Sequence, residues 1–242
     1  MKAAFLEGTG VSKRFGGLQV LNQVGFRVAE GEIVALIGPN GAGKTTLLNL
    51  VNGLQRPSTG AIRVGGEPAE ALPAHRIARL GIARTFQTPR PFLDLTAVEN
   101  VRTAALFGGR QAHAEPDALL ALVELDAQAN VRARHLPGPH RKLLELAMAL
   151  AQGPRVVLLD EILAGLTPTE VVRAAAILRR IRDEYGVGLF WIEHVMQAVM
   201  ATAERVIVLD HGEVIAEGAP RAIARDARVL EAYLGKSTAR KT

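Results

Sequence analysis

The sequence predicts an α/β fold in which a parallel sheet carries a helical insertion. In the second half of the chain, apolar runs of strand length alternate with segments of helix length. Earlier, a glycine-rich loop separates a buried strand from a helix. Between these regions, residues 89–152 show apolar residues at helical spacing instead. Strands that alternate with helices form parallel sheets, because each helix carries the chain back across the sheet.

The first third of the chain predicts antiparallel strands followed by the first unit of the parallel sheet. Between residues 3 and 30, apolar and polar residues alternate in Gly17–Leu21 and Val24–Val28, which indicates strands with one buried face. The next predicted elements are a buried strand at 32–37, a helix at 45–54, and strands at 61–64 and 82–86.

The remainder predicts the helical insertion, the rest of the sheet and a short helical end. The predicted elements after the insertion are a strand at 156–159, a helix at 169–185, strands at 187–192 and 206–209, and two short helices within 220–234. We expect one domain, residues 1–235, with its insertion at about 89–152. Residues 236–242 form a polar tail that we expect to be flexible.

Composition limits the classes of function. The chain has 242 residues, and its 48% hydrophobic fraction can fill a sizeable core. Its apolar runs fall well short of the roughly 20 residues that cross a bilayer. The first seven residues reach an acid, Glu7, too early for a signal peptide. The absence of cysteine excludes disulfides and thiolate metal sites. We therefore expect a cytoplasmic protein whose membrane contact is peripheral.

The net charge of +5 raises the possibility of a nucleic-acid partner. The arginines, however, are scattered along the chain, and aromatic residues make up only 4% of it. That is too few for a surface on which bases stack. We expect no nucleic-acid partner, and solvated helix faces account for the arginines.

Residues 38–46 contain the phosphate-binding pattern G-x-x-x-x-G-K-[ST] between a strand and a helix, the context that gives this pattern its meaning. Glycines let successive backbone N–H groups point at an anion, and the helix N-terminus adds to the attraction. Lys44 is expected to bridge the β- and γ-phosphates, and the Thr45 hydroxyl to bind Mg²⁺. The residues expected to hold ATP are Gly38, Asn40, Gly41, Gly43, Lys44, Thr45 and Thr46.

Two acids, Asp160 and Glu161, end the apolar run that begins at Val156. In a parallel sheet such a strand ends beside the phosphate loop, because ligands lie at the carboxyl edge. We expect Asp160 to hold Mg²⁺ through water and Glu161 to polarise the attacking water. The alternative, that the two acids only cap the next helix, is weakened by the phosphate loop upstream.

Further motifs resemble ABC-type ATPases over essentially the whole chain. Gln87, in Ala83–Gln87, is similar to the family's Q-loop glutamine, which implies that it reaches Mg²⁺ and the attacking water and relays motion to a membrane subunit. His194 resembles the switch histidine that contacts the γ-phosphate. Ala164–Pro168 resembles the D-loop that contacts a second ATPase, and Phe15 the aromatic residue that stacks on adenine.

Within that class, the chain resembles the ATP-binding subunits of branched-chain amino acid importers. The resemblance lies in residues 13–18, 84–87, 193–196 and 229–235. It implies an ATPase on the cytoplasmic face of the inner membrane, two permease subunits, a sister ATPase and, indirectly, an external solute-binding protein. Related machines take amides, urea or aromatic acids, so the cargo stays open. The direction of transport likewise rests on the resemblance alone.

The chain departs from the family at its signature motif, Leu-Ser-Gly-Gly-Gln or a close variant. That place reads Leu136-Pro137-Gly138-Pro139-His140. Pro137 replaces the serine hydroxyl, and Pro139 replaces a backbone N–H, because proline has none. Because one subunit's signature completes the other's ATP site in this family, we expect an asymmetric heterodimer, with a homodimer as the alternative.

Two other functions remain open at this stage. One is a non-catalytic or weakly catalytic, ATP-gated subunit of the same complex, which the altered signature favours. The other is a soluble ABC ATPase that acts on nucleic acid or ribosomes. Such proteins usually carry a long coiled-coil insertion or two nucleotide domains, and this chain has neither.

Overall fold

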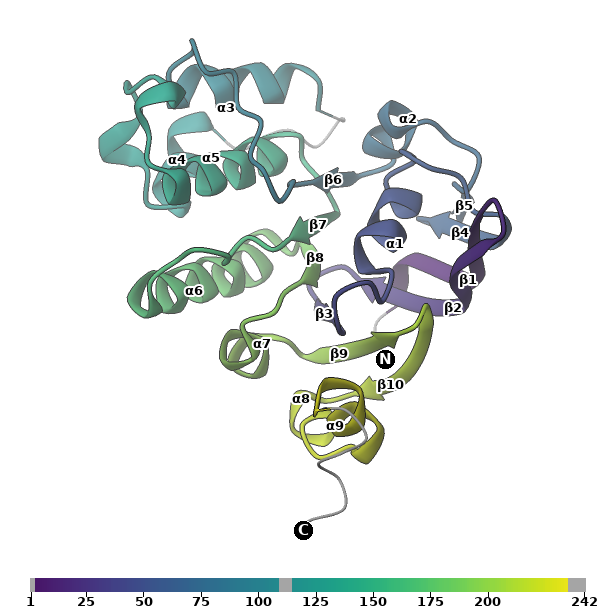
Figure 1. Cartoon of the computed structure of the whole chain (residues 1–242). Helices are drawn as coiled ribbons and strands as arrows, with labels where there is room; N and C mark the ends of the chain where they lie inside the picture. Colours follow the sequence, from purple (N-terminus) through teal and green to yellow (C-terminus); the bar gives the residue numbers. More distant parts are fainter. Residues whose placement is uncertain (1–2, 109–114, 235–242) are drawn as a thin grey trace.

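Two β-sheets organise the fold in the computed structural model, which describes residues 3–108 and 115–234 (Figure 1). The tail predicted at residues 236–242 lies outside the described residues. The larger sheet has the order β10-β9-β3-β8-β7-β6. Its strands are β3 (Ile33–Ile37), β6 (Ile82–Arg84), β7 (Val156–Asp160), β8 (Gly188–Ile192), β9 (Arg205–Asp210) and β10 (Glu213–Gly218).

All neighbours in this sheet pair in parallel except β10, which is antiparallel to β9 at the edge. The predicted parallel core is therefore confirmed. Strand β10 was not predicted. It is joined to β9 by a two-residue turn in which His211 has φ 45° and Gly212 has φ 80°, the positive angles of a tight hairpin.

The second sheet is antiparallel and has the order β2-β1-β4-β5. Its strands are β1 (Ala4–Phe15), β2 (Leu18–Ala29), β4 (Thr59–Val64) and β5 (Glu67–Pro68). The two alternating runs predicted as separate strands both lie in β2, except for Gly17, which belongs to the turn before it. Between them Gln23 has φ 51°, and the register against β1 shifts there. A bulge thus interrupts the alternation without ending the strand.

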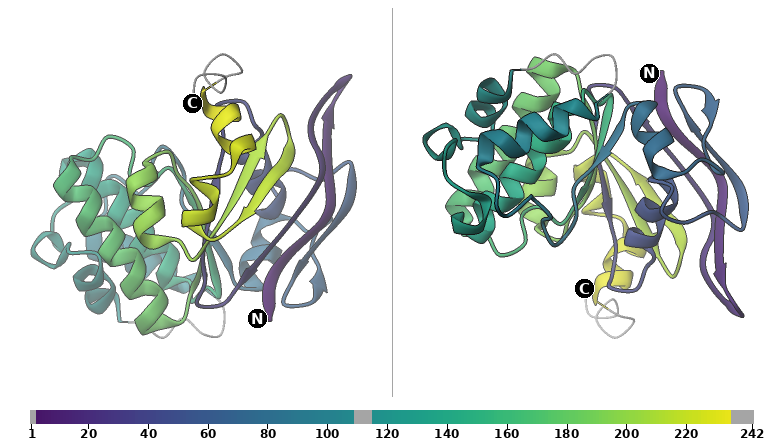
Figure 2. Two further views of the ribbon diagram at one scale, coloured as in Figure 1. Left: turned by 90° about the horizontal axis from the view of Figure 1, so that it is seen from below. Right: turned by 90° about the horizontal axis from the view of Figure 1, so that it is seen from above.

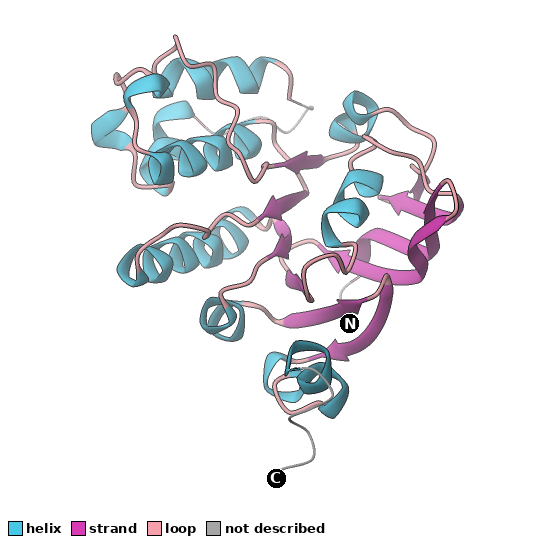
Figure 3. Ribbon diagram, in the orientation of Figure 1, coloured by secondary structure: helices cyan, strands magenta, loops and turns pink. Residues whose placement is uncertain are grey.

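Helices cover both faces of the larger sheet. Their bounds are α1 (Lys44–Val51), α2 (Ala74–Arg79), α3 (Ala97–Leu106), α4 (Pro116–Leu122), α5 (Gly138–Ala151), α6 (Pro168–Tyr185), α7 (Met196–Thr202), α8 (Pro220–Ile223) and α9 (Ala227–Leu234), with 3₁₀ turns at Asp126–Gln128 and Ala133–His135. Between β6 and β7 the described chain has helices and turns but no strand, as predicted (Figure 3).

The core has two parts, one on each face of the central sheet. On β3, Ile33, Ala35 and Ile37 pack with the helices between β6 and β8, whereas Val34 and Leu36 pack with α1 and the antiparallel sheet. Successive strand residues point to opposite faces, so a strand buried on both faces is apolar throughout. Figures 1 and 2 show α1 between the two sheets and the helices α3–α6 on the far side.

Specific ends fix the helix that follows β7. At the start of α6, the Thr167 hydroxyl accepts the Glu170 N–H while the Glu170 carboxylate accepts the Thr167 N–H. This capping box satisfies donors that the first turn leaves unpaired. At the other end Gly186 takes φ 65°, which glycine adopts without strain. Within residues 3–108 and 115–234, the helices are too short or too polar to cross a membrane.

Candidate functional site

The glycine-rich loop joins the end of β3 to the start of α1 and is closely surrounded. At Gly38, which has φ +152°, a Cβ would lie 1.9 Å from the carbonyl oxygen of Leu209. At Gly43, which has φ +103°, a Cβ would lie 2.7 Å from a methyl carbon of Leu21. Both positions therefore require glycine, and the tight loop places its backbone around a central space.

Lys44, the first residue of α1, turns back into this loop. Its Nζ donates hydrogen bonds to the carbonyl oxygens of Gly38 at 2.7 Å and Pro39 at 2.9 Å. The residue is 6% exposed, and burial lowers the pKa of its ammonium group. Carbonyl oxygens do not neutralise the charge of this ammonium group, so it can still bind a negatively charged ligand.

A cavity of about 280 Å³ opens in front of the loop and joins it to β2 and to the loops that follow β7 and β8. It is lined by Val20, Asn40, Gly41, Gly43, Lys44, Thr45, Thr46, Glu161 and His194. Residues that the sequence predicts around a triphosphate thus share one cavity with two of the three predicted catalytic residues. Gly38 joins the same site through its carbonyl bond to Lys44.

Three side chains meet at Glu161, one of the residues that line this cavity. The Gln87 amide donates to one oxygen of the Glu161 carboxylate at 2.7 Å, and His194 Nε2 lies 2.8 Å from the other. They follow β6, β7 and β8, which are neighbours in the sheet. The carboxyl ends of parallel strands meet at one edge, which explains why residues far apart in sequence converge.

Glu161 is held in an uncommon backbone conformation. It has φ 50°, in the left-handed region that non-glycine residues seldom adopt. Its N–H donates to the Ile192 carbonyl at 3.0 Å, and its own carbonyl accepts from the Lys142 ammonium at 3.1 Å. The carboxylate is therefore aimed by contacts on both sides of its backbone, at a strain of about 1–3 kcal/mol.

Asp160, by contrast, lies behind the cavity in a buried ion pair. Its Oδ2 is 3.0 Å from Arg84 Nη2, and the two side chains are 5% and 4% exposed. Burial raises the pKa of Asp160, although the hydrogen bond from Arg84 and the charge of Lys44 oppose that rise. The same Arg84 guanidinium donates to Asn49 of α1, the helix that follows the phosphate loop, at 2.7 Å, so the ion pair lies against that helix.

The predicted Mg²⁺ ligands have suitable chemistry. Thr45, Gln87 and Asp160 supply hydroxyl, amide and carboxylate oxygens, the donors that Mg²⁺ prefers. The described residues contain no cluster of three or more His, Asp or Glu side chains able to bind a metal.

Phe15 is not brought into this cavity. It ends β1 at the hairpin to β2, is 45% exposed, and its ring lies 4.9 Å from the Lys13 ammonium. Of the described residues that line the cavity, Val20 is the one that comes from the antiparallel sheet. Adenine stacking on Phe15 therefore remains a prediction.

The altered signature does form a helix start. Pro137 is the N-cap of α5, which begins at Gly138 with Pro139 in its first turn, where proline is tolerated. Arg141, which follows the altered signature, is held through Nε and Nη2 by backbone carbonyls of its own subunit. Its guanidinium donates to the carbonyls of Ala133, Arg134 and Leu136 at 2.7–3.1 Å.

The structure adds four charged residues that sequence reasoning missed: Arg84, Lys142, Glu145 and Glu193. Glu193 is 1% exposed and accepts backbone N–H groups from His194, Val195 and Leu163 at 2.8–3.2 Å. It thereby ties the loop of the switch histidine to the loop after Glu161. For Glu145 and Glu193, the available sequence signal was an acid next to or inside an apolar run. Such an acid indicates a buried carboxylate with specific partners.

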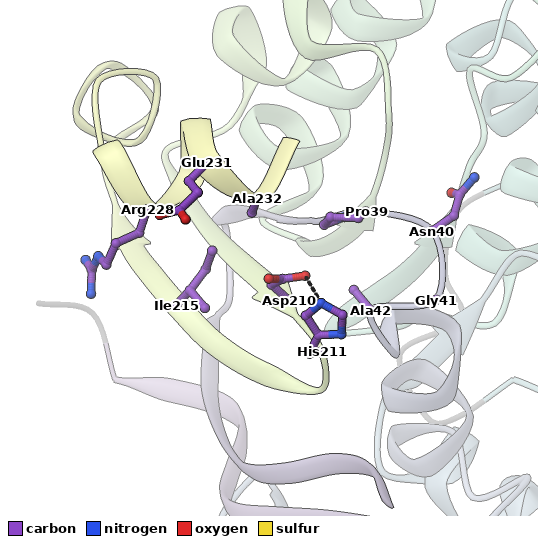
Figure 4. A pocket seen from close by; sticks show the side chains of 10 residues that line it. All are labelled: Pro39, Asn40, Gly41, Ala42, Asp210, His211, Ile215, Arg228, Glu231 and Ala232. Atoms are coloured by element: carbon purple, nitrogen blue, oxygen red, sulfur yellow. Dashed lines mark ion pairs between the residues drawn. The ribbon is translucent and has the colours of Figure 1, made fainter. Parts of the chain in front are cut away.

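A second, larger cavity of about 790 Å³ also lies against the phosphate loop (Figure 4). It is lined by Pro39, Asn40, Gly41, Ala42, Asp210, His211, Ile215, Arg228, Glu231 and Ala232. From α9, Tyr233 reaches the loop: burial raises the pKa of its phenol, and a backbone hydrogen bond with Gly38 opposes that rise. The chain's last described helix therefore abuts the loop.

Comparison with known proteins decides the family. The sequence profile of the ABC transporter family matches residues 21–164, the part of the chain that holds the phosphate loop, Gln87 and Glu161. The chain belongs to the ABC transporter family. A second profile, described as branched-chain amino acid ATP-binding cassette transporter, matches residues 213–239 of this ABC ATPase.

Individual relatives extend the likeness to nearly the full length. The high-affinity branched-chain amino acid transport ATP-binding protein BraF of Pseudomonas aeruginosa is 38% identical, over 98% of this chain and 100% of the relative. The corresponding protein LivG of Escherichia coli K12 is 35% identical with the same coverage. Among solved structures, the ADP conformation of MJ1267, an ATP-binding cassette of an ABC transporter, has a TM-score of 0.86 and 25% identity over 97% of this chain and 100% of that one.

These findings confirm the fold class and the ATPase activity expected from the sequence. The ADP-bound neighbour supports a nucleotide as a ligand of the chain. An ABC ATPase acts as a subunit of a transporter complex, which implies membrane permeases as partners.

Proposed function

We propose that this ABC ATPase hydrolyses MgATP to drive the import of branched-chain amino acids or related small solutes such as amides, urea or aromatic acids. The observation that carries the catalytic part is the contact of Gln87 and His194 with Glu161, which lines the phosphate-loop cavity. The likeness to BraF and LivG and the match over residues 213–239 support the solute class.

In this proposal each group has a defined task. The phosphate loop and Lys44 hold the phosphates, and Glu161 accepts a proton from the water that attacks the terminal one. Both oxygens of Glu161 are engaged by Gln87 and His194 in the structure. A bound γ-phosphate offers His194 another acceptor, which frees one carboxylate oxygen for the water.

We assign the Mg²⁺ to Thr45, Asp160 and Gln87, where it would neutralise phosphate charge. Asp160 is paired with Arg84 in the structure, so holding the ion through water requires no direct loss of that pair. Phe15 remains our candidate for the adenine contact, because it lies at the exposed tip of the β1–β2 hairpin.

The altered signature supports an asymmetric pair of ATPases. Each lost phosphate donor costs roughly 3 kcal/mol of transition-state stabilisation, about a hundredfold in rate. This chain's loop, Glu161 and His194 would then face an intact signature on a sister subunit. The sister's nucleotide would face Pro137 and Pro139 and turn over slowly. The pair would dock on two permeases at the cytoplasmic face of the inner membrane, with a solute-binding protein outside.

The decisive experiment is Glu161→Gln in the assembled transporter. Loss of the base should lower the ATPase rate about 10²–10⁴-fold. The matched control is Glu184→Gln, an exposed acid on α6 that is ion-paired with Arg180, and it should leave the rate unchanged. If Glu161→Gln also left the rate unchanged, the second candidate would hold: a non-catalytic, ATP-gated subunit, which the altered signature favours.

A further inference from the structure

Helix α5, which begins at the altered signature, carries a buried acid that grips the loop around Gln87. Glu145 lies in the middle of α5 and is 7% exposed. One of its carboxylate oxygens accepts the Phe86 N–H at 2.9 Å, and the other accepts the Arg90 N–H at 3.0 Å. The two donors stand on either side of Gln87 in sequence, so the carboxylate closes the loop on which Gln87 is mounted.

The same helix also holds the loop that carries Glu161. Lys142 precedes Glu145 by three residues, a spacing that places the two side chains on one side of the helix. Its Nζ donates to the carbonyls of Glu161 at 3.1 Å and Ala164 at 2.7 Å. One rigid element therefore contacts the backbone of both loops whose side chains meet at the Gln87–Glu161 hydrogen bond.

The choice of residue suggests a function beyond packing. Burying a carboxylate is unfavourable, and burial is the main cause that raises the pKa of Glu145 despite its two N–H donors. On either side of it, Leu144 and Leu146 are fully buried apolar residues of α5. Only a carboxylate offers two acceptors at this spacing, because a glutamine amide has one oxygen.

We propose that Glu145 is a positioning residue that sets Gln87 against Glu161, so that the signature end of α5 is mechanically connected to the catalytic carboxylate of its own subunit. The inference rests on the catalytic role proposed for Glu161. It requires no phosphate donor from Pro137 or Pro139. A change at the altered signature, where a sister subunit would lie, would reach Gln87 through the orientation of α5.

The test compares Glu145→Gln with the wild type in the assembled transporter. We expect kcat to fall about tenfold, the effect of losing one hydrogen bond to a charged group. KM for ATP should change by less than about twofold, because the phosphate loop is untouched. The control Glu184→Gln should change neither value. An unchanged kcat for Glu145→Gln would overturn the proposal.

A double-mutant cycle separates positioning from general destabilisation. If Glu145 acts through Gln87, then Gln87→Ala with Glu145→Gln should have about the rate of Gln87→Ala alone. Two effects that multiply would refute the proposal. Hydrogen exchange gives a reading independent of activity: peptides that span Phe86–Arg90 should exchange faster in Glu145→Gln. Exchange that rises throughout the helical region instead would indicate a merely structural role.

Poor folding of the amide variant would not end the test. Glu145→Asp keeps the charge but is one methylene shorter, so it should hold only one of the two donors and give an intermediate kcat. A wild-type kcat for a folded Asp variant would contradict the two-point grip. In the same preparation, Glu161→Gln distinguishes the two levels of failure. If it abolishes hydrolysis while Glu145→Gln keeps the wild-type kcat, only this inference fails.

Discussion

Substituting Arg84 with methionine tests the ion pair behind the cavity. Arg84 ends β6 and donates to Asp160 at 3.0 Å and to the amide oxygen of Asn49 at 2.7 Å. Methionine keeps much of the side chain's length but removes the charge and every donor. The Asp160 carboxylate would then remain buried without its cation, in a place that side-chain exposures of 4–5% show to be closed to water.

The expected size of the effect follows from this geometry. Charges about 4 Å apart attract by about 4 kcal/mol at an effective dielectric constant near 20. Removing one member of a buried pair costs about 3–5 kcal/mol, because the other charge stays behind. Burial is nevertheless the first cause of the raised pKa of Asp160, so desolvation opposes the pair strongly. The double variant Arg84→Met/Asp160→Asn should therefore lose only about 1–2 kcal/mol.

Urea unfolding of the purified chain near neutral pH measures these free energies. The control is Arg180→Met on α6, whose ion pair with Glu184 has side chains 47% and 49% exposed and should contribute less than about 0.5 kcal/mol. Two results would refute the reasoning: a loss below about 1 kcal/mol for Arg84→Met, or a double variant as unstable as the sum of the single ones.

The other predictions concern the phosphate loop and the buried acid of α5. Gly38→Ala should lose about 2–5 kcal/mol of stability, because its Cβ meets the Leu209 carbonyl oxygen. Gly41→Ala, at φ +82° in open space, should lose only about 1–2 kcal/mol. Thermal unfolding of both variants measures the two losses, and equal losses would contradict the prediction. Burial raises the pKa of Glu145 above 4.5, so the folded chain binds more protons than the unfolded chain in the range just above that value. The free energy of unfolding of the wild type relative to Glu145→Gln should therefore rise as pH falls through that range, and a flat or falling difference would contradict it.

Much of the fold could be predicted because the central strands are buried on both faces. Residues 33–37 and 156–159 are apolar throughout, so their short runs stand out from the amphipathic helices around them. Strand β10 escaped prediction because an edge strand that is partly exposed has no such pattern. The bulge at Gln23 made β2 look like two strands in the sequence, because a local change of register interrupts the alternation of apolar and polar residues as a strand end does.

In the site, eight of the nine residues that line the phosphate cavity, all but Val20, could be named in advance, because the spacing of glycines and the placement after strands carry the information. The residues that hold them could not. Arg84 and Glu145 are about 60 positions apart in the sequence, and each contacts a distant segment. Arg84 binds Asp160 at the end of β7, and Glu145 binds the loop after β6. Sequence periodicity contains no distance between such positions. The contacts of the Arg141 guanidinium with three carbonyls of its own subunit also join positions that no sequence pattern relates.

By itself, the sequence determined the phosphate loop, the alternation of strands and helices that makes the parallel sheet, and the loss of two donors at the signature. These are local properties, since glycine spacing, proline's missing N–H and apolar runs act within a few residues. Only the tertiary structure decided which side chains share a hydrogen bond: Gln87 with Glu161, Arg84 with Asp160, and Glu145 with the loop around Gln87. Those contacts depend on the order β6-β7-β8 and on the placement of α5 against it, which long-range packing sets.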